Sequence, residues 1–280
     1  MSIQTIIDRI NAWMPGATDN AAEAFLRNLH KVHKDPKDPN DYKASQADFS
    51  KVKFSNIPKK SSESQYDSLP RNQGHREICV SERTRSAAES FYNEKNGCRD
   101  SNFSPEFINY YAEQWDNHDP EGTYPRLGCK ALKEKGIPIY GLYPVMPRFS
   151  DVQEPPLFVI EDAERRRCKA YYRAGSIQQI CKAIYRNDFN RKRGIPNRYY
   201  VGGSFKIFKS ILGCTILPMP QKYERSLGIH DMRIADYDLT KQWFKIRNSW
   251  GLMSHDAGYL YMSFEYFKKY KGDIWVIEYE

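Results

Sequence analysis

The chain has 280 residues, of which 40% are hydrophobic and 14% are aromatic. This composition supplies enough apolar material for one large domain or two joined lobes, and it excludes global disorder. The 43 Lys and Arg residues give a formal net charge of +8, yet they are mixed with 35 Asp and Glu residues. We therefore expect a solvated basic face, with neither nucleic acid nor a membrane as partner.

The sequence carries no signal for secretion or membrane insertion. No stretch approaches the roughly 20 apolar residues that span a bilayer, and Asp8 and Arg9 interrupt the apolar periodicity of the N-terminus. We expect a protein that is cytoplasmic as synthesised, which leaves non-classical secretion or delivery to a host cell open. The 6 cysteines include no CxxC pair, so we expect mostly free thiols and no metal site.

The N-terminal part is expected to contain two helices, over residues 3–14 and 16–34. A stretch rich in Lys, Asp, Ser and Pro follows up to residue 70 and is typical of a linker or a wrapping arm. Residues 1–60 are therefore assigned to a helical N-terminal segment and linker, which serves as a pro-segment or a docking arm.

Helices are expected next, and strands follow after residue 195. The helices carry end signals: Ser104 and Ser176 as N-caps, Gly97 and Gly136 at C-termini. They cover residues 78–96, 104–117, 127–138 and 176–188. A period of two then predicts strands over 198–208, 228–238, 242–250, 258–267 and 273–279. The fold class is α+β, with a mainly helical lobe (61–175) before a mainly β lobe (176–280).

One polar pair stands out on the apolar side of the predicted strands. Asn248 shares a strand face with Phe244, Ile246 and Trp250, where an amide without a hydrogen bond would cost roughly 1–3 kcal/mol. His230 lies 18 residues earlier, at the start of the preceding strand. If the two strands pair, the side chains lie together, and the amide oxygen would fix one tautomer of the imidazole. For either residue alone, a structural role remains the alternative.

A histidine held in this way can exchange a proton with a nucleophile through its other ring nitrogen, so a suitable Cys or Ser is expected elsewhere in the sequence. Cys79 stands at the predicted start of a helix, where exposed N–H groups and the helix dipole favour a thiolate. Gln73 lies six residues earlier. Its side-chain amide and the backbone N–H of Cys79 can both donate to an oxygen that becomes negative when a thiolate adds to a carbonyl.

The order Gln, Cys, His, Asn resembles that of the papain-like cysteine peptidases. The resemblance rests on "NQGHREIC", on "GIHD" and on "IRNSWG" followed by "GYLYM", with "EGTYP" as a weaker match. It spans roughly residues 66–270, and the Asn-Ser-Trp-Gly piece is its most specific element. The chain is accordingly identified as a diverged member of bacterial type.

The resemblance implies a two-lobe fold with a catalytic cleft between the lobes, and residues 61–280 as the peptidase domain. It implies that Cys79 is the nucleophile, His230 the general base and acid, Asn248 its orienter and Gln73 the oxyanion donor. Gly122 and Thr123 would bind the substrate backbone, and Trp250 would shield the His and Asn pair at the substrate site. The implied reaction is cleavage of a protein or peptide substrate through an acyl-enzyme, without cofactor.

The chain also departs from the pattern of that family. Glu82, Arg83 and Arg85 follow the nucleophile on the central helix, where buried unpaired charges are costly. Helical spacing predicts that Arg85 pairs with Glu82 and Glu89. The segment "LMSHDAGY" lacks the usual second Trp-Gly. These departures keep a second hypothesis open, a catalytically degenerate module that binds peptides without cutting them.

Overall fold

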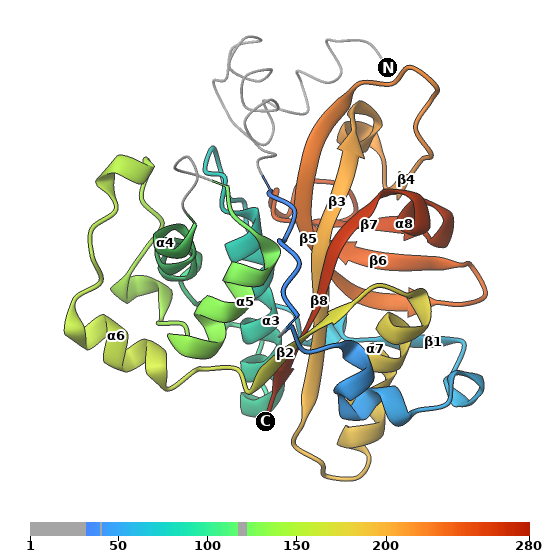
Figure 1. The fold of residues 1–280 in the computed structure, drawn as a ribbon, viewed down its shortest axis with the longest axis horizontal. Coiled ribbons are helices and arrows are strands. Elements are labelled where there is room, and N and C mark those ends of the chain that lie inside the picture. Colours follow the sequence, from blue (N-terminus) through green and yellow to red (C-terminus); the bar gives the residue numbers. More distant parts are fainter. Residues whose placement is uncertain (1–31, 40, 117–121) are drawn as a thin grey trace.

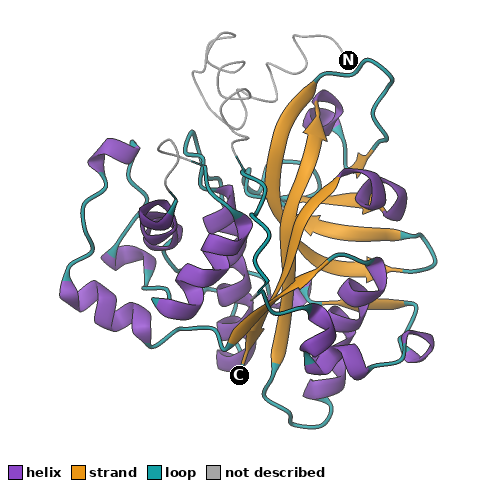
Figure 2. Ribbon diagram, viewed as in Figure 1, coloured by secondary structure: helices purple, strands orange, loops and turns teal. Residues whose placement is uncertain are grey.

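The computed structural model describes residues 32–39, 41–116 and 122–280, so both predicted N-terminal helices lie outside the described residues. Helices gather on one side of the molecule and a twisted sheet on the other (Figures 1 and 2). The predicted α+β order, a helical part followed by a mostly antiparallel sheet, is confirmed.

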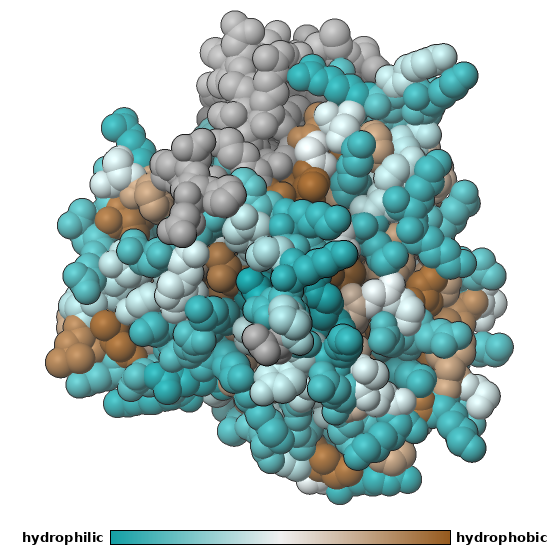
Figure 3. Space-filling view, viewed as in Figure 1, coloured by the Kyte–Doolittle hydropathy of each residue, from teal (hydrophilic) through white to brown (hydrophobic). Residues whose placement is uncertain are grey.

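The helical lobe contains α3 (Cys79–Asn96), α4 (Pro105–Trp115), α5 (Pro125–Glu134) and α6 (Leu157–Glu164). The predicted end signals act as expected: Gly97 closes α3 in the left-handed region at φ 65°, and Ser104 accepts the N–H of Phe107 at the start of α4. Helix α6 was not predicted. It follows two prolines and leaves Leu157 and Phe158 exposed, and apolar atoms gather at this end of the surface (Figure 3).

The β lobe is built on one sheet with the strand order β2-β8-β3-β5-β6-β7-β4, and β1 pairs with β5 outside that order. The strands are β1 (Lys60–Ser62), β2 (Ala170–Ala174), β3 (Arg198–Phe208), β4 (Ile216–Leu217), β5 (Ser226–Asp238), β6 (Trp243–Arg247), β7 (Tyr259–Ser263) and β8 (Lys271–Tyr279). Helices α7 (Ile177–Arg191) and α8 (Phe264–Tyr270) pack on the sheet.

Several strand predictions need correction. The strand expected over 242–250 ends at Arg247, so Asn248 and Trp250 lie just beyond β6. The strand expected over 258–267 ends at Ser263, because the Ser263 hydroxyl accepts the N–H of Tyr266 and starts α8. Strands β1, β2 and β4 were not predicted. Of these, β2 pairs with β8 at the edge of the sheet. Short 3-10 turns complete the fold, at Ala44–Gln46, Asp48–Lys51, Phe54–Asn56, Ser64–Tyr66, Tyr140–Leu142, Phe149–Asp151 and Lys209–Gly213.

The expected wrapping arm does bury side chains. Ala44, Ala47, Phe49 and Ile57 join the core of the β lobe, and Phe49 packs edge-on against Tyr199 of β3. Residues 32–39 and 41–43, which we call the strap, precede this part and descend between α5 and β8 (Figure 1). Within the described ranges, no helix has the length and apolar character that crossing a membrane requires.

The charges on the central helix are buried and paired. Arg85 bonds Glu82 at 2.5 Å and Glu89 at 2.6 Å, which confirms the predicted pairs. Arg83 reaches across the lobes to Asp231 of β5, 2.9 Å away. These pairs satisfy the charges that had counted against burial of the helix.

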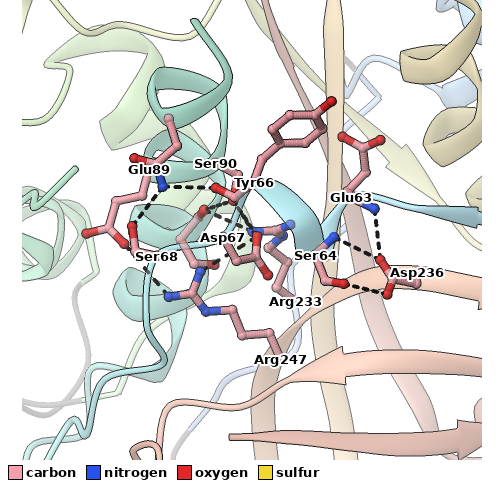
Figure 4. A network of polar contacts seen from close by, with 12 residues as sticks. Glu63, Ser64, Tyr66, Asp67, Ser68, Glu89, Ser90, Arg233, Asp236 and Arg247 are labelled. Carbon is pink, nitrogen blue, oxygen red and sulfur yellow. Dashed lines mark hydrogen bonds and ion pairs between the residues drawn. The ribbon is translucent and has the colours of Figure 1, made fainter. Parts of the chain in front are cut away.

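A second group of charges joins the lobes beside this helix (Figure 4). Arg233 of β5 lies 2.6 Å from Asp67, and Arg247 of β6 lies 3.8 Å from both Asp67 and Glu89. Burial would raise the pKa of Asp67, but the charges of Arg233 and Arg247 outweigh it, and its pKa falls below the usual value. The interface between the lobes is therefore held by ions as well as by apolar packing.

Candidate active site

Strands β5 and β6 pair antiparallel and bring His230 and Asn248 together, as their spacing predicted. Nε2 of His230 lies 2.8 Å from Oδ1 of Asn248, and both side chains are buried. The backbone N–H of Ser249 donates to the same oxygen at 2.8 Å. Since a backbone N–H only donates, this atom must be the amide oxygen. His230 therefore carries its proton on Nε2, which leaves Nδ1 as the basic nitrogen.

Trp250 covers this pair. Its ring stacks on the imidazole of His230, with the centroids 5.1 Å apart and the planes inclined by 23°. Only 2% of Trp250 is exposed. Water is thereby kept from the bond between His230 and Asn248, which strengthens that bond electrostatically.

Cys79 is the first residue of α3, as predicted. The backbone N–H groups of Asp231, the residue after His230, and of Val80 act to lower the pKa of its thiol. Burial, followed by the charges of Asp231 and Glu77, nevertheless raises the pKa of the Cys79 thiol to about 12. Burial likewise lowers the pKa of His230 to about 4. In this conformation, both groups are neutral near pH 7, contrary to the expectation of a thiolate at the helix start.

The strap takes part in the burial of Cys79. Val32 forms an apolar cluster with Cys79 and Val80, against which Ile229 packs. The next residue, His33, donates its backbone N–H to the carbonyl of Thr123 at 3.3 Å. The strap thus lies over the candidate nucleophile.

The predicted backbone-binding residues face the strap. Thr123 is buried and pairs with His33 through its carbonyl, and Gly122 before it has a φ of 96°, which favours glycine. The ring of His33 lies 5.3 Å from that of Tyr124. The strap therefore occupies the place expected for a substrate backbone.

Gln73 is buried in the loop before α3 and bridges the two lobes. Its backbone N–H donates to the carbonyl of Ser249 at 2.9 Å, and its Nε2 donates to the carbonyl of Arg76 at 2.8 Å. Arg76 in turn pairs with the buried Glu106 of α4 at 2.8 Å. One of the two hydrogens on Nε2 of Gln73 is engaged in the loop that leads to Cys79, so the amide is held in place.

Sequence reasoning missed His255. Its Nδ1 lies 2.8 Å from the carbonyl oxygen of Cys214, and its Nε2 lies 3.1 Å from Nδ2 of Asn248. Its ring also lies 5.6 Å from that of Trp250. The available signal was a histidine seven residues after Asn248, in the segment that lacks the second Trp-Gly.

The remaining cysteines and acidic groups offer no alternative metal chemistry in the part of the chain that the structure describes. All 6 cysteines lie there, and they are free thiols. Among these residues, no group of three or more His, Cys, Asp or Glu side chains is arranged to hold a metal ion.

Comparison with known proteins shows which proteins this chain resembles. No family model matches the sequence. The chain is 24% identical over 181 residues to an uncharacterized peptidase C1-like protein of Acanthamoeba polyphaga mimivirus. The aligned region covers 61% of this chain and 57% of that protein. The chain thus spans little more than half the length of this relative. Among solved structures, xylellain, a cysteine protease from Xylella fastidiosa, superposes with a TM-score of 0.77 over 91% of this chain and 97% of xylellain, at 21% identity.

This chain has the papain-like fold. Procathepsin B S9 from Trypanosoma congolense shares it with a TM-score of 0.64 at 14% identity, over 98% of this chain and 96% of that one. In the papain-like fold of this chain, α3 carries Cys79 at its start, and the sheet carries His230 and Asn248. At these identities the likeness is one of fold, and the chemistry has to be argued from the residues.

Proposed function

We propose that this chain is a cysteine peptidase held in a latent state by its strap. The observation that carries the proposal is the 2.8 Å bond from His230 to Asn248 beneath Trp250, with Cys79 at the start of α3. The papain-like fold and the likeness to xylellain support it. The substrate class is a protein or peptide, which enters the cleft once the strap leaves.

Each residue of the site has its own role in the proposed reaction. Nδ1 of His230 takes the proton from the Cys79 thiol, and the sulfur attacks the carbonyl carbon of the scissile bond. Nε2 of Gln73 and the backbone N–H of Cys79 stabilise the oxyanion. His230 then gives its proton to the leaving amine, and water releases the acyl group and restores the thiol. Asn248 stabilises the imidazolium that forms in between.

The proposed peptidase becomes active when the strap leaves the site. Val32 packs in the apolar cluster that contains Cys79, and burial keeps both Cys79 and His230 neutral. Once water reaches the site, the desolvation that raises the thiol pKa and lowers the imidazole pKa diminishes, and the proton moves from sulfur to nitrogen. The resulting thiolate and imidazolium are the reactive pair.

A second candidate is a non-catalytic peptide-binding module. The raised pKa of Cys79, caused first by burial and then by the charges of Asp231 and Glu77, favours it. The two candidates differ in the thiol: an inert thiol after opening of the strap supports binding alone, and a reactive thiol that depends on His230 supports the peptidase.

The deciding experiment measures labelling of the full chain by an epoxide probe for papain-like thiols between pH 4 and pH 9. We expect Val32→Gly to accelerate labelling of Cys79 and to give hydrolysis of fluorescein-labelled casein. Val152→Gly, a partly buried valine of the helical lobe, is the matched control and should not accelerate it. Cys79→Ala and His230→Ala in the Val32→Gly background should abolish both signals. Casein hydrolysis that survives Cys79→Ala would refute the proposal.

A further inference from the structure

The side chain of Asn248 bridges two imidazoles. Its Oδ1 accepts from Nε2 of His230 and from the N–H of Ser249, both at 2.8 Å. Its Nδ2 lies 3.1 Å from Nε2 of His255. Each end of one buried amide is thus engaged, and the two histidines lie on opposite ends of it.

The direction of every hydrogen bond in this row is determined. The carbonyl of Cys214 only accepts, so Nδ1 of His255 must carry the proton and donate. In the neutral ring, Nε2 of His255 is then an acceptor, and it receives an N–H of the Asn248 amide. The row therefore runs from His230 through Asn248 and His255 to the carbonyl of Cys214, with each member donating to the next.

We propose that His255 is a positioning residue that holds the Asn248 amide in the orientation His230 requires, an inference that rests on the proposed peptidase function for its effect on turnover. If the amide turned over, an N–H would face Nε2 of His230, and the ring would have to place its proton on Nδ1. That nitrogen is the one assigned to the thiol proton. His255 opposes this reversal, because a turned amide would present its oxygen to a nitrogen that has no proton.

The surrounding loop is built to keep His255 in place. The N–H of Asn248 donates to the carbonyl of Gly258 at 3.0 Å, and the N–H of Gly258 donates to the carbonyl of Ser254 at 2.7 Å. His255 adopts a φ of 51°, a left-handed conformation that a residue other than glycine seldom takes. The loop thus returns to the backbone of Asn248. Its left-handed residue is His255, whose ring contacts the Asn248 amide.

A purely structural histidine is the competing explanation, since the ring of His255 also packs against Trp250. Packing needs only the ring, whereas positioning needs a lone pair on Nε2. His255→Phe keeps a ring of similar size and removes both nitrogens. His255→Gln loses the ring and offers an oxygen that can accept the N–H of Asn248. The two variants therefore separate the explanations, and both place a non-glycine residue at the same φ.

The first test reads the histidine tautomers by nitrogen-15 NMR of the histidine side chains in the full wild-type chain, near pH 7. We expect a neutral His255 with its proton on Nδ1 and a neutral His230 with its proton on Nε2. His255→Phe and His230→Asn variants assign the signals. A wild-type His255 with its proton on Nε2 would overturn the proposal, and this result does not depend on activity.

The second test measures kcat and KM in the Val32→Gly background, where the strap is loosened, on the coumarin tetrapeptide that the Val32→Gly chain cleaves fastest in a positional library. Loss of one neutral hydrogen bond should lower kcat about two- to tenfold in His255→Phe, with KM unchanged, and His255→Gln should recover most of it. Equal kcat in the Val32→Gly chain with and without His255→Phe would overturn the proposal, as would a larger loss with His255→Gln. A Val32→Gly chain that cleaves no tetrapeptide defeats the proposed function, while the NMR test still decides the role of His255.

Discussion

Raising the pH from 4 to 7 is expected to loosen the strap, because of the surroundings of Asp35. Its carboxylate accepts the indole N–H of Trp275 at 2.6 Å and the backbone N–H of Arg126 at 3.1 Å. Burial, together with the nearby charge of Asp273, raises the pKa of Asp35 from 3.8 to about 6, and these effects exceed the lowering by both hydrogen bonds and by Arg173.

The sign of the effect follows from that shift. A carboxyl group whose pKa is raised by docking binds its proton more tightly in the docked strap, so docking is favoured at low pH. The contribution is complete below pH 3.8 and is lost as the pH rises through about 6. A shift of about two units corresponds to about 3 kcal/mol, or on the order of a hundredfold in the docking equilibrium.

Hydrogen exchange measures this directly. The amides of His33 and Asp35 donate to Thr123 and Asp273 only while the strap is docked. After correction for the intrinsic exchange rate, their protection should fall on the order of a hundredfold between pH 4 and pH 7. In Asp35→Ala, which lacks the titrating group, protection should be lower and nearly constant with pH. Protection that stays level or rises with pH in the wild-type chain would refute the reasoning.

Two predictions concern stability. Asp67→Asn removes the charge that Arg233 faces at 2.6 Å in a buried site, so the free energy of unfolding in urea should fall by about 3–5 kcal/mol; an unchanged midpoint would contradict the assigned ion pair. Gly203→Ala would put a Cβ 2.1 Å from the backbone oxygen of Asp273 and should cost roughly 1–3 kcal/mol or more. Gly141→Ala is its control, because no described atom lies within 4 Å of the added Cβ, and a comparable loss there would show that the close approach is not the cause.

Local signals explain most of what the sequence predicted about the fold. Caps such as Ser104 and Gly97 act through neighbouring backbone groups, and alternation along β3 and β5 reflects one buried strand face. Strand β2 was not predicted, because four of its five residues are partly exposed. Its formation depends on pairing with β8, far along the chain. Such pairing leaves little trace in local composition.

In the candidate site, too, local patterns were predictable and contacts between distant segments were not. The placement of His230 beside Asn248 follows from strand parity and was predictable. The protonation states of Cys79 and His230 were not, because they depend on burial, and Val32, from a distant part of the chain, packs against Cys79. His255 needed the conformation of an irregular loop, and no periodic pattern describes that.

The ion pair between Arg83 and Asp231 has a consequence for how this site can evolve. Arg83 lies four residues after Cys79, and Asp231 directly follows His230, so the pair joins the two halves of the candidate site. An apolar contact can drift through many single substitutions, each of small effect. Loss of either charge here would strand the other in a buried site, so descendants of this chain must exchange both together or keep both. The spacing between Cys79 and His230 is thus protected from gradual change by a neighbour that takes no part in the proposed reaction.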